Sequence, residues 1–317
     1  MHRDTAWTHE DIHDLTGKTI IVTGANSGIG FEAATHLAAK GAHIVMACRN
    51  EQKATHAIKL ITQRFDKAQI SFIPLDLADL KSIKAFTETF LKNHDRLDVL
   101  INNAGIMAIP KRSTKDGFEM QLGTNHLGHF ALTGHLLNTL LNTPESRVVS
   151  VSSVAHRMGK IRFRDLHGDK KYDPWKAYGQ SKLANLLFTY ELDHRLRSIH
   201  ADTIAVACHP GYSSTNLQLV GPQMQNSSLK EKLNALGNQV IAQSAYMGAL
   251  PTLYAATADD VAGGDYIGPD GFMEMRGYPK KVTSNSASQS VETGRKLWEV
   301  STQLTDVHYD ALSISPT

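Results

Sequence analysis

The stretch that decides the fold is "KTIIVTGANSGIGFEAATHLAAKG", Lys18 to Gly41. It opens with a short β-branched run that ends at a glycine, as a buried strand does. The residues after the turn place Ile29, Ala33 and Leu37 on one helical face, and Gly41 supplies a helix stop. The sequence therefore predicts a strand, a glycine-rich turn and a helix in direct succession.

Three glycines in the turn "TGANSGIG" have separate roles. Gly24 permits a tight turn, Gly28 lets the backbone approach a phosphate, and Gly30 lets the helix lie close to the sheet. The N-terminus of the helix adds unpaired N–H groups and partial positive charge, which attract a pyrophosphate. We therefore expect a dinucleotide here, although a glycine-rich turn that only packs would look similar. The residues expected to bind it are Gly24, Asn26, Ser27, Gly28, Ile29 and Gly30.

Strands and helices alternate along most of the chain. The strands are continuous apolar runs rather than period-2 runs, which is what burial on both faces produces. This pattern predicts a single-domain, doubly wound α/β fold of the Rossmann type, with a parallel sheet and helices on both faces. A short last strand, "DYIG" at 265–268, is expected at the sheet edge. The other expected strands lie at 18–25, 42–49, 69–77, 97–105, 147–153 and 202–209, and the later expected helices at about 118–141, 175–196 and 243–257.

The domain is expected to span residues 17–300, between an N-terminal tail, 1–16, and a C-terminal tail, 301–317. Within it, the segment 213–250 breaks the regular pattern and begins with many Gln, Asn and Ser residues. Long irregular segments at the carboxyl ends of such a sheet usually shape a ligand site. We therefore expect this segment to form a lid over the substrate.

Composition excludes several classes of function. A net charge of +2 over 317 residues indicates no dedicated nucleic-acid surface. The chain lacks a run of about 18 apolar residues, and its polar N-terminus lacks the apolar core of a secretory signal, so we expect a cytoplasmic protein without an integral membrane segment. Cys48 and Cys208 lie in apolar runs and are expected to be buried free thiols. The 16 histidines are scattered without metal-ligand spacing, so we expect most of them on the surface and no metal site.

The end of the second strand bears on the choice between NAD and NADP. An acidic residue there would accept hydrogen bonds from the ribose hydroxyls of NAD. This chain has "ACRN", with Arg49 and no carboxylate, and a guanidinium can bind a 2′-phosphate through charge-assisted hydrogen bonds. We therefore expect NADP (NADPH) as the cofactor, with NAD less favoured. Asp76 and Leu77, in "PLDL", are expected beside the adenine, although Asp76 could equally cap a turn.

Six motifs occur in a fixed order between Lys18 and Leu217. Together they closely resemble the short-chain dehydrogenases/reductases, and the combination is too specific to arise by chance. The resemblance implies a Rossmann-type oxidoreductase that acts on CH–OH groups with NAD(P). The motifs are "TGANSGIG", "NNAG" at Asn102–Gly105, Asn125 in "TNHLGHF", Ser153 in "SVSSVAH", "YGQSK" at Tyr178–Lys182 and "HPGYSSTNL" from His209.

Finer features resemble the retinol-dehydrogenase-like branch of that family. They are "ACRN", "INNAGIM", the wide gap between Ser153 and Tyr178, "SKLANLLF" and "KLWEVSTQLT". Membrane-bound members of the branch carry an N-terminal anchor and we expect none in this chain, which argues against a membrane-dissolved retinoid as substrate. Many relatives self-associate through two long helices, here 118–141 and 175–196. A homodimer or homotetramer formed through these helices is therefore one expectation. The same helix faces could equally be solvated or covered by the chain's own tail.

Two Tyr–Lys pairs with the same spacing compete for the catalytic role. In "KYDPWK", Pro174 lies between Tyr172 and Lys176 and disfavours helical geometry before it. In "KAYGQSKLANLLF" no proline interrupts the helix, so Tyr178 and Lys182 lie on one face. Tyr178 and Lys182 are therefore the expected catalytic pair, in agreement with their place in the family motif.

Carbonyl reduction needs a hydride from the cofactor and a proton for the oxygen. The resemblance assigns the proton to Tyr178, whose free pKa near 10 would be lowered by Lys182, a cation that would also bind the nicotinamide ribose. Ser153 would donate to the substrate oxygen as charge develops, while Ser152 should point to the opposite face of the strand. Asn125 matches the family's fourth member, expected to hold a water that links Lys182 to solvent. A helix-interior Asn bonded to its own backbone is the alternative.

Two further motifs are expected at the cofactor. "NNAG" could support the cofactor or serve only the central sheet. In "HPGYSSTN" the Pro-Gly pair forces a turn, and in the family this loop covers the nicotinamide, with Thr215 at the position that contacts its carboxamide. An ordinary turn is the alternative. The residues concerned are Asn103, Ala104, Gly105, Pro210, Gly211 and Thr215.

These features favour an NADP-dependent oxidoreductase that interconverts an alcohol and its aldehyde or ketone, with an apolar small-molecule substrate. A second hypothesis is a dinucleotide-binding regulatory protein that senses redox state without turnover. The presence of Tyr178, Lys182, Ser153 and Asn125 together argues against it, because a sensor needs no acid, cation and oxyanion donor. A sugar-nucleotide epimerase is ranked lower, because it would normally have a larger C-terminal domain.

Overall fold

One sheet forms the centre of the fold. The computed structural model of the chain describes residues 6–212 and 244–312. Its strands are β1 Thr19–Thr23, β2 His43–Cys48, β3 Gln69–Pro74, β4 Val99–Asn102, β5 Arg147–Val151, β6 Ile204–Cys208, β7 Tyr266–Pro269 and β8 Pro279–Lys281. They pair in the order β3-β2-β1-β4-β5-β6-β7-β8, and each pair is parallel except β7 with β8. The order reverses between β1 and β4, which is where such sheets bind ligands.

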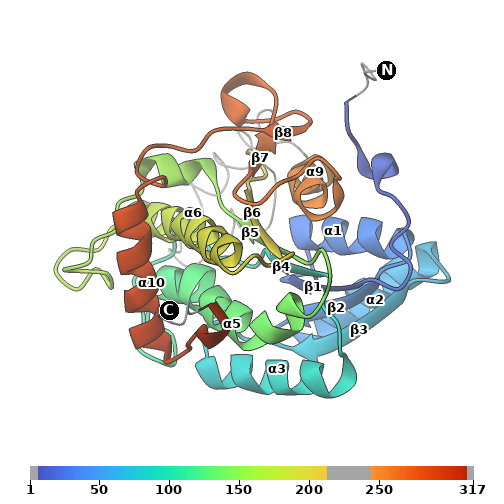
Figure 1. The fold of residues 1–317 in the computed structure, drawn as a ribbon, viewed down its shortest axis with the longest axis horizontal. Coiled ribbons are helices and arrows are strands. Elements are labelled where there is room, and N and C mark those ends of the chain that lie inside the picture. Colours follow the sequence, from blue (N-terminus) through green and yellow to red (C-terminus); the bar gives the residue numbers. More distant parts are fainter. Residues whose placement is uncertain (1–5, 213–243, 313–317) are drawn as a thin grey trace, which may run out of the picture.

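Helices cover both faces of the sheet (Figure 1). The longer ones are α1 Gly28–Ala39, α2 Glu51–Arg64, α3 Leu80–Asn93, α5 Gly128–Leu141, α6 Pro174–Ser198, α9 Ala245–Thr257 and α10 Val291–Thr305. In β1, Ile20 and Val22 pack with α1, α2 and α9, whereas Ile21 packs with α3, α5 and α6. All three side chains are fully buried, as expected of a strand covered on both faces. The predicted doubly wound α/β fold is therefore confirmed.

The predicted edge strand is not the last strand of the sheet. β7 pairs in parallel with β6, and β8 then adds to it in antiparallel register, with Ile267 opposite Lys281. β8 consists of Pro279, Lys280 and Lys281, of which only the proline is buried. Three mostly exposed residues carry no apolar pattern, so their strand conformation comes from pairing with β7.

The expected helix at 118–141 is interrupted near its start. A short helix, α4, covers Met120–Leu122, a π-helical turn covers Gly123–Leu127, and α5 follows directly. Single π turns inside helices often occur at functional sites. This one contains Asn125, so the irregular turn coincides with a residue that the sequence assigns to catalysis.

The N-terminal segment is not a loose tail from residue 6 onward. Ile12 and Leu15 are buried in the core cluster under α1. The amine of Lys40 donates to the backbone carbonyls of Glu10 at 2.9 Å and Ile12 at 2.7 Å. The expected tail 1–16 is therefore wrong for its second half, because two apolar side chains and one lysine fix it to the domain.

The C-terminal segment also belongs to the domain. Trp298 of α10 packs edge-on to Phe130 of α5 and stacks on Phe188 of α6, with ring centroids 5.2 and 5.8 Å apart. The hydroxyl of Tyr309 donates to the carbonyl of Phe130 at 2.6 Å, and Leu312 is buried. The expected tail 301–317 is therefore wrong up to residue 312. The chain's own C-terminal segment therefore covers this face of α5 and α6. Cover by the tail was one of the alternatives to self-association through these helices.

The segment expected as a substrate lid, 213–250, overlaps helix α9 at its end, and its role as a lid remains a prediction. Residues 245–250 belong to α9, where Ala249 and Leu250 are completely buried against the sheet. The rest of the expected lid, 213–243, lies outside the described residues. The helix expected at 243–257 is confirmed by α9.

Candidate active site

A cleft of about 710 Å³ opens at the carboxyl ends of the central strands. This volume suits a cofactor with a substrate, because ligand pockets usually span roughly 300–1,000 Å³. Gly211, Ser153 and Asn125 are not among the lining residues, and Thr215 lies outside the described residues. The predicted residues that line the cleft are Gly24, Asn26, Ser27, Gly28, Ile29, Gly30, Arg49, Asp76, Leu77, Asn103, Ala104, Gly105, Tyr178, Lys182 and Pro210.

The glycine turn has the geometry that a dinucleotide site requires. Gly24 and Gly28 have φ angles of +67° and +55°, which favour glycine. A Cβ on Gly30 would lie 2.5 Å from both the Gly24 carbonyl oxygen and Asn103 Nδ2, so the helix could not start so close to the sheet with a larger residue. Ser27, the N-cap of α1, makes no side-chain capping hydrogen bond, unlike the N-caps of α2, α3, α6, α9 and α10. The first N–H groups of α1 therefore face the cleft without a side-chain cap, and the residues present fit a pyrophosphate.

Thr23 joins this turn to the "NNAG" motif. Its hydroxyl oxygen accepts hydrogen bonds from the backbone N–H groups of Asn103 and Ala104, both at 2.9 Å. The Asn103 side chain donates to the Thr23 carbonyl at 2.8 Å. Asn103 thus holds the glycine turn in place through the end of β1. In this position it serves the central sheet and the turn expected to bind the cofactor at the same time.

His129 is a buried residue of this network that the sequence did not identify. Its Nδ1 lies 3.0 Å from the Asn125 carbonyl, so Nδ1 carries the proton. Its Nε2 then accepts from the Thr23 hydroxyl at 3.0 Å. Burial lowers the pKa of His129 to about 4, so the ring is neutral at physiological pH. His129 therefore connects the π-helical turn at Asn125 with the glycine turn.

We expect His129 to make the protein sensitive to acid. The folded state keeps the ring neutral down to about pH 4, whereas the unfolded chain binds the proton near pH 6.5. Stability is therefore lost as pH falls from 6.5 to 4, by roughly 3 kcal/mol from this residue. Urea unfolding at several pH values should show a shallower loss in His129→Gln. His194→Gln, at an exposed position of α6, should keep the wild-type slope; equal slopes in all three proteins would contradict the prediction.

Asn125 uses its side chain to fix the segment after "NNAG". Its Oδ1 accepts from the Ile106 N–H at 2.8 Å, and its Nδ2 donates to the Ile106 carbonyl and to Ser181 Oγ, both at 2.9 Å. The helix-interior alternative, with Asn125 bonded to its own helix, is therefore not what the structure shows. A Cβ on Gly105 would lie 3.2 Å from Asn125 Oδ1 and 3.5 Å from Lys182 Nζ, so these three residues meet at one point. The expected water remains a prediction.

Tyr178 and Lys182 lie together in the wall of the cleft, on one face of α6. The Lys182 amine lies 5.8 Å from the centre of the Tyr178 ring and donates to the Val151 carbonyl at 2.9 Å. Burial lowers the pKa of Lys182 to about 8. Burial also raises the pKa of Tyr178 to about 12, opposed by a hydrogen bond with Ser153. The lowered tyrosine pKa expected from the lysine is therefore not found for the protein's own groups, and the phenol is a proton donor at neutral pH.

The two serines at the end of β5 differ in role. Ser153 hydrogen-bonds the Tyr178 phenol and accepts from the Ala155 N–H at 3.2 Å. Ser152 lines the cleft, but it is buried and its hydroxyl donates to the Lys182 carbonyl at 2.8 Å. This difference follows the alternation of side chains predicted for a strand.

The competing tyrosine, Tyr172, lies outside helix α6 and away from this cleft. Its hydroxyl donates to the Ile109 carbonyl at 3.0 Å or to the Glu119 carboxylate at 3.1 Å. Asp173 is the N-cap of α6 and accepts from the Lys176 N–H at 2.9 Å, so the helix begins between the two members of this pair. Tyr172 and Lys176 therefore do not share the geometry of Tyr178 and Lys182.

The end of the cleft beside β2 and α2 is basic. Arg49 is exposed at the end of β2, and Lys53 and His56 line the cleft from the adjacent face of α2. These two residues were not identified from the sequence; they lie three residues apart in α2 and line the cleft together with Arg49. Asp76 is the acidic residue among the lining side chains of the described chain. It caps a turn by accepting from the Ala78 N–H at 3.0 Å, so the alternative role is observed and the adenine contact remains a prediction.

Ten of the fifteen histidines in the described residues are at least partly exposed, which agrees with the expectation of a mostly surface set. The other five are buried, and four of them, His126, His129, His156 and His209, make hydrogen bonds in the core or around the cleft. Across residues 6–212 and 244–312, no three His, Cys, Asp or Glu side chains gather as a metal site would require. Both cysteines are buried free thiols, as predicted. The buried histidines are His36, His126, His129, His156 and His209.

Comparisons with known proteins agree with this geometry. A family model described as short chain dehydrogenase matches residues 18–225. Mouse (Mus musculus) retinol dehydrogenase 12 is 41% identical over 298 residues, covering 93% of this chain and 89% of the relative. Mouse retinol dehydrogenase 13 is 40% identical over 294 residues, covering 92% and 84%.

Solved structures with the same fold agree with these sequence matches. An uncharacterised protein from Mycobacterium Paratuberculosis is 40% identical, with a TM-score of 0.79 over 96% of this chain and 99% of that one. A short chain dehydrogenase from Shigella flexneri shares the fold at 22% identity, with a TM-score of 0.61 over 80% and 98%. No helix within the described ranges has the length and apolar character that spanning a bilayer requires. The chain belongs to the short-chain dehydrogenase family, in the branch of the retinol dehydrogenases, and is an oxidoreductase that acts on alcohol groups with a nicotinamide dinucleotide.

Proposed function

We propose that the protein is an NADP-dependent oxidoreductase that interconverts an alcohol with its aldehyde or ketone, with Tyr178 as the acid/base. The observation that carries this proposal is the buried Tyr178–Lys182 pair in the wall of a dinucleotide-sized cleft. Four residues would share the chemistry, namely Tyr178, Lys182, Ser153 and Asn125. The bound cofactor would supply or accept the hydride.

Each of these residues has a separate task in carbonyl reduction. The Tyr178 phenol, protonated at neutral pH because burial raises its pKa, gives its proton to the substrate oxygen. Ser153, hydrogen-bonded to that phenol, donates to the same oxygen as negative charge develops. Lys182 provides a cation beside the phenol, and Asn125 holds the Ile106 backbone next to it. In the oxidation direction the tyrosine takes the proton back from the alcohol.

The preference for NADP rests on charge. Arg49, Lys53 and His56 line the end of the cleft where the 2′-phosphate of the adenosine ribose would lie, and the two residues directly after β2 are Arg49 and Asn50 rather than a carboxylate. A carboxylate there would repel a phosphate, whereas a guanidinium binds it. The Shigella flexneri protein of the same fold is complexed with NADP. Both observations support NADPH over NADH.

The cofactor preference predicts a selective effect of Arg49→Ser. We expect the dissociation constant of NADPH to rise about tenfold or more, because a charge-assisted contact contributes roughly 1.5–3 kcal/mol. NADH binding should change little, since it carries no 2′-phosphate. Isothermal titration with both cofactors would measure this. Arg64→Ser, which removes the same charge at the other end of α2, is the matched control; equal losses for NADPH and NADH in Arg49→Ser would contradict the proposal.

The substrate is proposed to be an apolar carbonyl or alcohol of medium size, converted in the cytoplasm. The relatives named retinol dehydrogenase support an apolar substrate class. A panel of aldehydes and ketones of increasing chain length, assayed with NADPH, tests this directly. A redox-sensing protein without turnover is not favoured, because a sensor has no need of the buried Tyr178–Lys182 pair.

A further inference from the structure

Glu274 lies in an unusual backbone conformation in the loop between β7 and β8. Met273 and Glu274 have φ angles of +51° and +57° in succession, and neither is glycine. Such left-handed residues are unfavourable for side chains with a Cβ and persist only where surrounding contacts hold them. Glu274 sits at the end of a short 3-10 helix, Phe272–Glu274, and its carboxylate contacts two segments outside this loop.

One carboxylate oxygen of Glu274 binds the loop after β6. Its Oε2 lies 3.0 Å from His209 Nε2, and the His209 side chain is fully buried. The Gly211 N–H donates to His209 Nδ1 at 3.2 Å, so Nδ1 is the acceptor and the proton is on Nε2. Glu274 therefore fixes the imidazole that holds Gly211, directly beside Pro210 in the cleft wall.

Backbone contacts between the two loops are equally close. The Tyr212 N–H donates to the Met275 carbonyl at 2.7 Å. Gly211 has a φ of +63°, and a Cβ there would lie 2.5 Å from the same carbonyl oxygen. A Cβ on Gly268 would collide with the His209 ring. The loop that carries Glu274 and the Pro-Gly loop therefore fit together with no space for larger residues.

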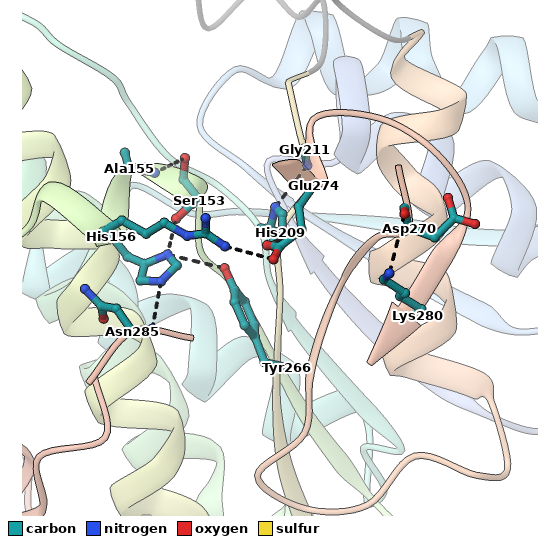
Figure 2. Close-up of polar contacts among 11 residues, drawn as sticks. Ser153, Ala155, His156, His209, Gly211, Tyr266, Asp270, Glu274, Lys280 and Asn285 are labelled. Carbon is teal, nitrogen blue, oxygen red and sulfur yellow. Dashed lines mark hydrogen bonds and ion pairs between the residues drawn. The ribbon is translucent and has the colours of Figure 1, made fainter. Parts of the chain in front are cut away.

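The other carboxylate oxygen binds the segment after the catalytic serine. Glu274 Oε1 accepts from Arg157 Nη2 at 2.8 Å. Arg157 belongs to the 3-10 helix Val154–Met158, for which Ser153 is the N-cap. In the same helix the His156 Nδ1 lies 2.7 Å from the Ser153 carbonyl. Figure 2 shows Glu274 beside His209, with Ser153, Ala155 and His156 together on the other side of the contact.

We propose that Glu274 is a positioning residue that ties the Ser153 segment to the Pro210–Gly211 loop. Its two oxygens hold Arg157 on one side and His209 on the other, so Ser153, the proposed donor to the substrate oxygen, and the loop expected to cover the nicotinamide keep a fixed relation. The hydrogen bond with His209 is also the main reason that the pKa of Glu274 is lowered, which keeps both oxygens ionised as acceptors. The inference rests on the proposed function, because Glu274 would position Ser153 and the Pro210–Gly211 loop for that reaction.

Three variants separate the two connections. Arg157→Met removes only the tie to the Ser153 segment, and we expect kcat for aldehyde reduction to fall about fivefold with the NADPH dissociation constant unchanged. Glu274→Ala removes both ties, so kcat should fall roughly tenfold and the NADPH dissociation constant should rise severalfold. Glu274→Gln keeps one acceptor oxygen for two donors and should lie between wild type and Glu274→Ala.

The chain offers a matched control. Lys281→Met breaks the ion pair between Lys281 and Asp265, whose charged atoms lie 2.9 Å apart and whose side chains are 43% and 23% exposed. The Arg157–Glu274 pair is similar, with charged atoms 2.8 Å apart and side chains that are 45% and 18% exposed. Lys281 belongs to β8 and lies away from the residues that line the cleft. We expect its kcat and NADPH affinity to equal those of the wild type. The double variant Arg157→Met/Glu274→Ala should lose no more activity than Glu274→Ala, because both changes act on one connection.

Hydrogen–deuterium exchange tests the tie without turnover. In Glu274→Ala, peptides that contain residues 153–159 and 209–212 should both exchange faster, and in Lys281→Met neither should. Unchanged exchange of both peptides in Glu274→Ala would overturn the inference, whatever the activity. Losses that multiply in the double variant, or wild-type kcat in Glu274→Ala, would overturn it as well. Absence of turnover in the wild type with altered exchange in the variant would instead contradict the proposed function and leave the connection supported.

Discussion

Replacing Tyr178 by Phe is expected to lower kcat for carbonyl reduction by roughly 10²–10⁴-fold, the usual contribution of a positioned acid. The phenol lies in the wall of the cleft, and its pKa of about 12 keeps it protonated at neutral pH, as the proposed role of proton donor requires. Phenylalanine keeps the ring and its packing with Trp175 but has no proton to give. The affinity for NADPH should stay within about twofold, because the lost hydroxyl acts on the reacting oxygen rather than on cofactor binding.

The matched control is Tyr172→Phe, which removes the same hydroxyl from the other Tyr–Lys pair. Tyr172 hydrogen-bonds the Ile109 carbonyl and Glu119, so this variant should lose some stability but keep kcat near the wild-type value. Stopped-flow reduction of an aldehyde with NADPH, together with thermal unfolding, separates the two effects. Substantial turnover in Tyr178→Phe, or an equal loss of kcat in Tyr172→Phe, would remove Tyr178 from the role of acid.

The elements that could be predicted from the sequence are those whose pattern is local. β1 and α1 follow from a β-branched run, three glycines and an apolar helical face, and each of these lies within about two dozen residues. β8 could not be predicted, because its polar residues become a strand only through pairing with β7. Ile12 and Leu15 are single apolar residues in a polar segment, and only the core into which they pack shows that they belong to the domain.

The residues of the site also differ in whether a local sequence pattern could reveal them. Tyr178 and Lys182 share one helix, and the glycine turn is a continuous stretch, so motif and spacing were sufficient to find them. His129 meets Thr23 across 106 residues, and Glu274 meets Arg157 across 117 residues. Contacts of such separation are decided by how the helices and loops cross the sheet edge, which no local pattern shows. The low pKa of His129 is equally invisible, because it arises from complete burial.

Replacing Lys182 by Met is expected to reduce activity and increase stability at once. The reduction in kcat/KM should be about 10²-fold or more, because the variant removes the cation next to the Tyr178 phenol and a group expected to hold the nicotinamide ribose. NADPH binding should weaken about tenfold, which distinguishes this variant from Tyr178→Phe.

The stability gain follows from the burial of the lysine. A pKa lowered from 10.5 to about 8 corresponds to roughly 3 kcal/mol of unfavourable burial of the charged amine at neutral pH. The unfavourable contribution is fully present below pH 8, and stability rises with pH as the folded-state amine loses its proton between about 8 and 10.5. Methionine has no charge to bury, and the Val151 carbonyl keeps a second donor, Asn185 Nδ2 at 3.1 Å. The free energy of unfolding of Lys182→Met at pH 7 should therefore equal or exceed that of the wild type.

Lys176→Met is the control for this variant, because it removes an exposed lysine from the first turn of the same helix. It should leave kcat/KM, NADPH affinity and the melting temperature close to the wild-type values. A Lys182→Met protein that loses activity and also unfolds more easily would indicate a structural lysine whose effect on turnover is indirect. A loss of activity together with an equal or greater free energy of unfolding would mean that the buried charge of Lys182 destabilises the wild-type fold. A residue retained for catalysis is expected to have this effect.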